Sequence, residues 1–282
     1  MPSSNFGGLD GILNSIQKNR SGIGSSLSKI ASGRRLTSAG VDPAANALSE
    51  QLRSEIRSLT QAVQNAETGG NFLRTADSGL ASVGDLLARG RELATQAANG
   101  TLDSSQRAAI DQEFNQIREE IDRTAQSLDF NGQKLLDGSL SAGSSNPVDI
   151  QVGSGSGPEN QISVNVVENV SSASLGIDQT DLSTSQGALQ ALDDIDQAIA
   201  AVTSSRGEVG ATSNRLSSAG RGLESTIENL KATESNLGDT DLSSEISNLQ
   251  LSLTRFETSI RALTLRNQIN EGSSGGLLNT II

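Results

Sequence analysis

The chain of 282 residues contains no cysteine, no histidine and only five aromatic side chains, all of them phenylalanine. It therefore lacks disulfides, the usual general base and the commonest transition-metal ligand, so we expect no enzyme, no catalytic residue, no metal site and no cofactor. The net charge of −12 arises in residues 101–200 and comes with no basic patch, which argues against nucleic acid. No run of about 18 apolar residues predicts a membrane span.

The shortage of bulky side chains also bears on the fold. Five aromatic residues cannot fill the centre of an ordinary globule of this length, whereas leucine and isoleucine at heptad spacing can fill a thin seam between helices. The sequence therefore predicts a mostly α-helical fold: an elongated coiled-coil rod of long antiparallel helices with a small β-hairpin, in which the two termini pair at one pole.

Residues 1–43 are predicted to form a short helix and a connector. Apolar residues recur at heptad spacing from residue 9 to residue 30, but the surrounding glycine and serine weaken an isolated helix, which therefore needs a partner. Arg34 and Arg35 fit a solvated connector or a subunit contact equally well. Asp42 is expected to cap the next helix, with Pro43 in its first turn.

Residues 44–137 are predicted to form two rod helices. The first runs from residue 44 to about residue 98 and stops at Asn99-Gly100. Asp103 and Gln106 have the spacing of a capping box, which marks the start of the second. Phe130-Asn131-Gly132 is expected to end it.

Residues 138–187 change character and are predicted to form a β-hairpin and a polar connector. Apolar and polar residues alternate over 148–152 and again over 162–166, with a glycine-rich turn between the two runs. That turn lacks the Gly-Lys-Ser/Thr and the following helix of a phosphate loop.

Residues 188–238 are predicted to form one long rod helix, because an a/d register continues from Leu192 to Leu237 without a proline. Residues 239–282 carry the most regular heptad seam in the chain, followed by a glycine-rich linker at 272–276 and an apolar tip. We expect the two terminal seams to pair with each other.

Four stretches resemble bacterial flagellin in the order that this family has them. They are residues 26–66 and the segments RELATQAANGT (91–101), FNGQKLL (130–136) and DTDLSSEI (239–246). The resemblance covers nearly the whole chain, which lacks only the variable middle that builds outer domains in larger members. The opening MPSSNFGG, Asp42-Pro43 and the last six residues depart from the family pattern. Asp-Pro also occurs in the hook-filament junction protein, which is kept as the alternative.

The resemblance implies a structural subunit that polymerises into the extracellular filament of the bacterial flagellum, used for swimming. The first residues of the chain do not resemble a secretory signal peptide, so we expect export without a cleavable signal. Implied partners are copies of itself, an export chaperone, junction and cap proteins and an animal innate immune receptor.

The resemblance also implies two kinds of site. The first is the filament core, assigned to the terminal seams in residues 1–43 and 239–282: Leu13, Ile16, Ile23, Leu27, Ile30, Leu242, Ile246, Leu249, Leu253, Phe256, Ile260 and Leu263. The second is a patch of Arg89, Leu93 and Glu113, which the family presents to a neighbouring protofilament or to the immune receptor. Positions 89 and 93 are four apart and share a helix face.

Overall fold

The computed structural model describes residues 6–38, 40–145 and 147–278. Contacts divide the chain into a terminal unit, Met1–Ser54 with Asn229–Ile282, and a central unit, Glu55–Glu228. The boundaries fall inside the long helices α2 (Pro43–Ala97) and α4 (Ser185–Gly238), which contribute to both units. The predicted mostly α-helical fold with long antiparallel helices is confirmed, while the functional division expected at 43/44 and 238/239 stays a prediction.

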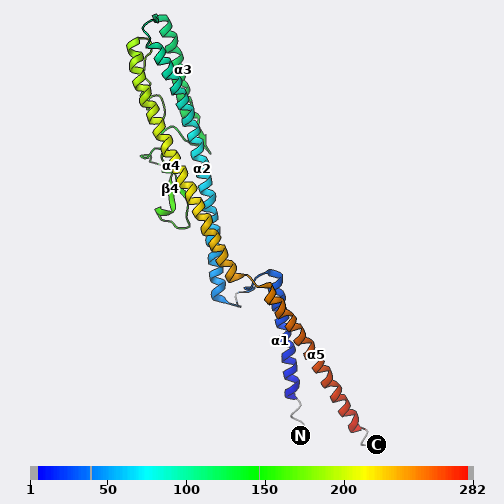
Figure 1. Cartoon of the computed structure of the whole chain (residues 1–282). Helices are drawn as coiled ribbons and strands as arrows, with labels where there is room; N and C mark the ends of the chain where they lie inside the picture. Colours follow the sequence, from blue (N-terminus) through cyan, green and yellow to red (C-terminus); the bar gives the residue numbers. More distant parts are fainter. Residues whose placement is uncertain (1–5, 39, 146, 279–282) are drawn as a thin grey trace. The chain divides into compact units, whose positions relative to one another are not determined.

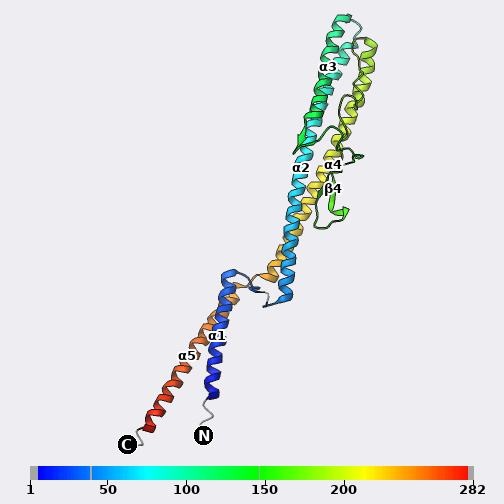
Figure 2. The same ribbon diagram turned by 180° about the vertical axis from the view of Figure 1, so that it is seen from behind.

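In the central unit, α2, α3 (Ser104–Ser127) and α4 lie side by side (Figures 1 and 2). Local signals set their ends. The Asp42 carboxylate accepts from the backbone of Ala45 at 3.0 Å, and Asp103 with Gln106 forms the predicted capping box. These helices therefore begin where the sequence predicted.

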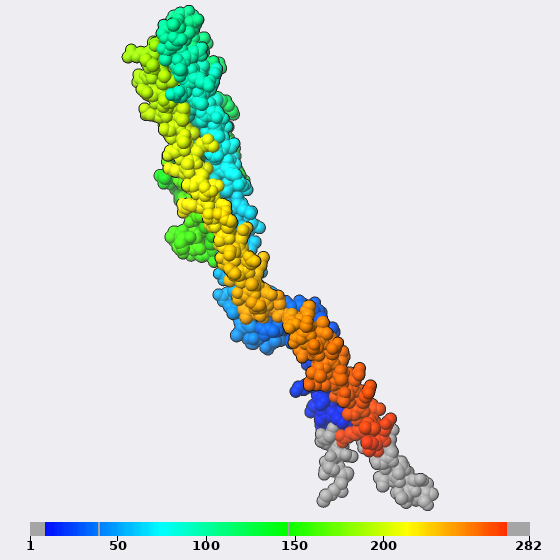
Figure 3. Space-filling view, in the orientation of Figure 1, coloured from blue at the N-terminus to red at the C-terminus, as the bar shows by residue number. Residues whose placement is uncertain are grey.

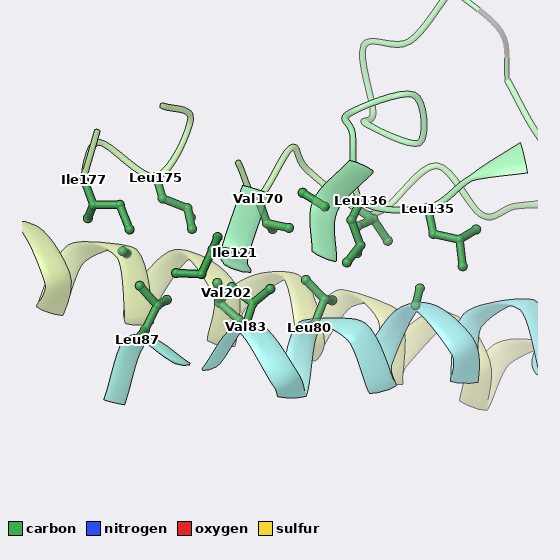
Figure 4. Packing of buried hydrophobic residues seen from close by; sticks show 14 of the residues in the cluster. Leu80, Val83, Leu87, Ile121, Leu135, Leu136, Val170, Leu175, Ile177 and Val202 are labelled. Atoms are coloured by element: carbon green, nitrogen blue, oxygen red, sulfur yellow. The ribbon is translucent and has the colours of Figure 1, made fainter. Parts of the chain in front are cut away.

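The core of the central unit is a seam of aliphatic side chains. Figure 4 shows the α2 residues Leu80, Val83 and Leu87 packed against Ile121 of α3 and Val202 of α4. Leu135 and Leu136 cover the same seam from the segment after α3. Each of these side chains is buried, so heptad spacing has produced a thin and closely packed core.

The buried face of α4 differs from its predicted seam by one column. Besides Ile227, four apolar residues spaced seven apart are buried as expected: Ile195, Val202, Val209 and Leu216. They alternate, however, with the small residues Ala191, Ala198, Ser205 and Thr212, while the predicted Leu192 and Ile199 are only half-buried. Small side chains at alternate layers allow α4 to approach α2 closely.

Along the chain, two hairpins come between α3 and α4. In the predicted hairpin, β3 (Asp149–Gln151) pairs antiparallel with β4 (Gln161–Ser163), and Ile150 lies opposite Ile162. Figure 3 shows this segment beside α4. A second hairpin, β1 (Asp129–Phe130) with β2 (Gln133–Lys134), was not predicted; Asn131 and Gly132 turn it with φ of 53° and 82°.

The turn of the β3–β4 hairpin, with the 3-10 helix η1 (Pro158–Asn160), is compact. The Gln151 amide donates to the carbonyls of Gly153 and Gly155 at 2.9 and 2.6 Å. A Cβ atom at Gly153 or Gly155 would lie 2.0 or 2.7 Å from side-chain atoms of Asn160. Glycine is therefore needed where the loop wraps around Asn160.

In the terminal unit, α1 (Phe6–Ser32) packs against α5 (Leu242–Leu278), and the two helices run antiparallel (Figure 1). The linker predicted at 272–276 is wrong, because α5 continues through these residues to Leu278. Extending a formed helix by one residue is much easier than nucleating one, even through glycine. The expected apolar tip at 279–282 lies outside the described residues.

Candidate assembly surfaces

The terminal helices α1 and α5 each turn one apolar and one largely polar heptad column toward the other. The apolar columns are Leu9, Ile16, Ile23 and Ile30 in α1 and Leu249, Phe256 and Leu263 in α5. Beside them, the second columns are Ile12, Asn19 and Ser26 in α1 and Glu245, Ser252 and Ser259 in α5. All of these side chains are half-buried or buried. Ile12 is apolar, so five of these thirteen side chains are polar: Asn19, Ser26, Glu245, Ser252 and Ser259.

The polar columns are joined by specific contacts. The Glu245 carboxylate, 8% exposed, is hydrogen bonded by Ser26 and lies 3.5 Å from Lys29 Nζ. The Ser26 hydroxyl, with Lys29 also contributing, lowers the pKa of Glu245, so the carboxylate stays charged. The Asn19 amide donates to Ser259 Oγ at 3.4 Å. Such polar layers favour one register between paired helices.

The predicted terminal seams pair only in part. The contact face includes Ile16, Ile23, Ile30, Leu249, Phe256 and Leu263, as expected. The other seam residues are 39–56% exposed, so the expected intramolecular pairing is wrong for Leu13, Leu27, Leu242, Ile246, Leu253 and Ile260. Relative to the predicted pairing, each helix is rotated about its own axis. One of its two predicted apolar columns therefore faces the partner helix and the other faces solvent. We call Leu13 and Leu27 of α1 with Ile246, Leu253 and Ile260 of α5 the outer columns.

The α1–α5 pair buries little apolar surface. Among the side chains described between residues 9–32 and 242–269, only Ser26 and Glu245 are buried, and neither is apolar. The central unit, in contrast, has fully buried leucine and isoleucine side chains from all three of its helices. Since apolar burial is the main stabilising contribution to folding, the terminal pair should open far more often than the central unit.

Limited proteolysis of the dissociated chain checks this difference. We expect trypsin to cut after Arg255 and Arg261 of α5 well before it cuts after Arg215 and Arg221 of α4. All four arginines are exposed and helical, so they are matched in everything except the stability of the helix that carries them. Fragment masses over time give the order of cleavage. Equal rates at the two pairs of sites would contradict the expectation.

A clamp joins the end of α1 to the turn between α4 and α5. We define it as residues 33–35 with residues 237–240. Gly33 has a φ of +68° and accepts at its carbonyl from Thr240 N–H at 3.0 Å. Arg35 donates its backbone N–H to the Gly238 carbonyl and its guanidinium to the Leu237 carbonyl, each at 2.7 Å. Arg35 therefore makes contacts within the chain. The sequence had suggested either a solvated connector or a contact between subunits.

The predicted surface patch is divided by the structure. Arg89 Nη2 lies 2.7 Å from Glu113 Oε1 on α3, and the hydrogen bonds that Arg89 donates to Glu113 and then to Glu92 raise the pKa of Arg89. Leu93 is only 2% exposed and belongs to the core, so its predicted place on the surface patch is wrong. α3 and α4 cover α2 from two sides here, and its buried face is wider than a single seam.

The described residues hold neither a membrane-spanning helix nor a metal site. No helix in that part of the chain is long and apolar enough to cross a membrane. Nor do the described side chains contain a group of three or more acidic residues, histidines or cysteines placed to hold a metal ion. Asp196 on α4 instead pairs with Arg91 of α2 at 2.6 Å, so this acid links two helices.

Long paired helices, a polar contact face and exposed apolar columns define a structural protein that associates through its helices. Residues 11–141 match the bacterial flagellin N-terminal helical region, and residues 192–271 match the bacterial flagellin C-terminal helical region. The chain is 35% identical over 220 residues to a flagellin of Halalkalibacterium halodurans, which covers 78% of this chain and 79% of that protein. It belongs to the bacterial flagellin family.

A second relative supports the family, and one solved structure shares the fold. The flagellar filament 30.7 kDa core protein of Treponema maltophilum is 32% identical over 257 residues, covering 88% of this chain and 90% of that protein. A putative flagellar hook-associated protein from Vibrio parahaemolyticus, 19% identical with a TM-score of 0.58, covers 71% of this chain and 100% of its own and shows a shared fold alone. The chain is thus a self-polymerising subunit of the flagellar filament, a surface structure, and nothing here favours the junction-protein alternative.

Proposed function

We propose that α1 and α5 form the core of the filament and that the outer columns are their contacts with the same helices of other copies. The observation that supports this is the exposure of Ile246, Leu253 and Ile260, which recur every seven residues along one side of α5. A sustained apolar column at this spacing requires a helical partner. The single chain does not provide one, and a homopolymer would.

The polar inner face supports the same proposal. A helix pair that met through both apolar columns of each helix would bury the outer columns and so leave them unavailable to other copies. Here Glu245, Ser252 and Ser259 take half of the inner face of α5, which leaves the outer columns exposed. Repeated, non-closing contacts of this kind produce open helical polymers.

The experiment that tests the proposal is reassembly of the purified, dissociated chain. Electron microscopy should show long tubes of uniform diameter, and hydrogen exchange should become slower over α1 and α5 once the chains have polymerised. Short caps in place of tubes would indicate the junction protein. Tubes in which α1 and α5 exchange as fast as in the single chain would refute the role of these helices.

Arg89 and Glu113 are proposed as a polar contact with a neighbouring protofilament. Both are about half exposed, on adjacent helices of the central unit, and together they present both signs of charge. Contact with an animal innate immune receptor stays a proposal for the same two residues. Leu93, being buried, is not part of this surface.

A charge swap distinguishes the ion pair between Arg89 and Glu113 within the chain from their proposed contact with a neighbouring protofilament. We expect Arg89→Glu combined with Glu113→Arg to leave the free energy of unfolding within about 1 kcal/mol of the parent, since exposed ion pairs contribute little. Polymerisation, followed by light scattering, should be slower, because each charge would then face the wrong partner group. The matched control swaps Arg206 and Asp77, another exposed pair between two helices. Equal polymerisation rates for parent and swapped chain would remove Arg89 and Glu113 from the interface.

Several finer features follow from the family and are proposals for this chain. They are export to the cell exterior without a cleavable signal peptide, help from an export chaperone, and contact with junction and cap proteins at the filament ends. We also propose that the subunit acts mechanically and has no catalytic role. The registers of α1 and α5 in neighbouring copies would then determine the shape of the filament.

A further inference from the structure

Asparagine stands directly before glycine at two places in the chain, Asn99-Gly100 and Asn131-Gly132. In such a pair the backbone nitrogen of the glycine can attack the side-chain amide carbon of the asparagine, because glycine has no side chain to shield that nitrogen. The attack is intramolecular, so no second reactant has to be brought into place. All four residues are exposed. A difference in reactivity between the two pairs must therefore come from the turns that hold them.

The turn after α2 holds the Asn99 side chain by its oxygen. Asn99 Oδ1 accepts hydrogen bonds from the Thr101 backbone N–H at 3.1 Å and from the Thr101 hydroxyl at 3.0 Å. When the Gly100 nitrogen attacks, negative charge develops on this oxygen. Two donors that already point at the oxygen stabilise that charge, as an oxyanion hole does.

The attacking nitrogen of Gly100 is also accessible. Among the described residues, no group accepts a hydrogen bond from the Gly100 N–H. A Cβ atom on Gly100 would meet nothing within 4 Å, so the space around the residue is open. The Asn99 pair thus combines a stabilised carbonyl oxygen with an unblocked nitrogen.

The Asn131 pair is held in the opposite way. It forms the turn between β1 and β2, where Asn131 and Gly132 both have a positive φ. The Gly132 N–H donates to Asp129 Oδ2 at 3.2 Å. Its nitrogen would have to lose a proton beside a carboxylate, where new negative charge is disfavoured. This turn should therefore protect its asparagine.

We propose that Asn99 is a site of spontaneous deamidation, promoted by the two hydrogen bonds from Thr101. The bond between Gly100 N and Asn99 Cγ forms, the bond from Cγ to Nδ2 breaks, and the Gly100 proton leaves with Nδ2 as ammonia. Water then opens the cyclic imide at either of its two carbonyls, which gives aspartate or isoaspartate at position 99. The reaction takes place within the central unit and does not rest on the role proposed for α1 and α5.

The surroundings of Asn99 determine what the modification does to the turn. The Arg107 guanidinium donates to the backbone carbonyls of Ala97 and Asn99 at 3.0 and 2.9 Å. Aspartate keeps the length of the backbone and brings a negative charge close to this guanidinium, which is favourable. Isoaspartate adds a carbon atom to the backbone and so displaces the carbonyls that Arg107 binds. Both products add a negative charge, but only isoaspartate should loosen the joint between α2 and α3.

Peptide mass spectrometry of the full chain measures the deamidation rate at both pairs in one sample. The dilute, unpolymerised chain is incubated in mildly alkaline buffer, with and without denaturing guanidinium chloride. The ratio of the native rate to the unfolded rate should be one or more at Asn99 and roughly one tenth or less at Asn131. Equal ratios at the two asparagines would overturn the proposal. Aspartate without isoaspartate at position 99 would also overturn it, since direct hydrolysis by water gives only aspartate.

Variants of Thr101 test the cause. Thr101→Ala removes the hydroxyl and keeps the N–H, so the native-to-unfolded ratio at Asn99 should fall roughly tenfold. Thr101→Ser keeps both donors, and its ratio should stay within about twofold of the parent. Each variant is compared with its own unfolded chain, which removes the effect of the local sequence. A ratio that is unchanged or raised in Thr101→Ala would overturn the proposal, because the hydroxyl would then not promote the reaction.

Discussion

We expect Leu253→Asp to abolish polymerisation while leaving the single chain folded, and Ile260→Asp to do the same. Both side chains are about two-fifths exposed in the single chain, at 42% and 39%, so a carboxylate there is solvated. In the polymer each lost aliphatic contact removes roughly 1.5–3 kcal/mol, and a buried unpaired carboxylate adds a penalty of several kcal/mol. The penalty recurs at every added subunit, so elongation should fail.

The matched control is Thr254→Asp, which introduces the same charge at the next position, an exposed residue about 100° around α5 from Leu253. Sedimentation and electron microscopy measure the polymer, and thermal unfolding measures the single chain. Filaments of parental length from Leu253→Asp would reject the outer columns as contacts. Loss of the main unfolding transition would instead show that Leu253 is needed for the fold.

Phe114→Ala should have the largest effect on stability, lowering the free energy of unfolding of the central unit by about 3–5 kcal/mol. The Phe114 side chain is 1% exposed, and its ring lies against the backbone of α2: a Cβ at Gly90 would be 2.9 Å from Phe114 Cε2. Removing the ring leaves a cavity that neither helix can close, because Gly90 has no side chain to move into it. The Arg118 guanidinium, 5.8 Å from the ring centroid, would also lose its contact.

Urea denaturation measures this loss of unfolding free energy, provided that the slope of free energy against urea concentration is the same in variant and parent. Glu113→Ala is the control, since it removes an exposed neighbour on the same helix and should change stability by no more than about 0.5 kcal/mol. A loss below about 1 kcal/mol for Phe114→Ala would mean that α3 moves to fill the space.

The sequence predicted the helices better than their rotations. Heptad spacing, Asp42, Asp103 and the polar breaks determine where a helix begins and ends, and these are local properties. Which two neighbouring columns of a helix face its partner depends on contacts between residues that are distant in the sequence. Glu245 and Ser26 lie outside the predicted seams, yet both are buried in the α1–α5 contact. Leu253 lies within a predicted seam and is nevertheless exposed.

Two other departures have different causes. Leu93 was expected on the surface because the family resemblance groups it with Arg89 and Glu113 and because it shares a helix face with Arg89, but a helix covered on two sides buries more than one column. The β1–β2 hairpin had a clear signal, since Asn-Gly is the strongest short-range mark of a two-residue turn. That signal was interpreted only as the end of α3.

The loop that wraps around Asn160 also constrains how this protein can change over generations. The carbonyls of Gly153 and Gly155 both accept hydrogen bonds from the Gln151 amide, and Cβ atoms at these two positions would meet the Asn160 side chain. Adding a residue between Gln151 and Gly155 would break these hydrogen bonds, so we expect insertions there to be tolerated only together with a new turn. Ser154 and Ser156 are exposed and can be replaced without disturbing the turn. Single mutations can therefore change the surface chemistry of this loop more readily than its length.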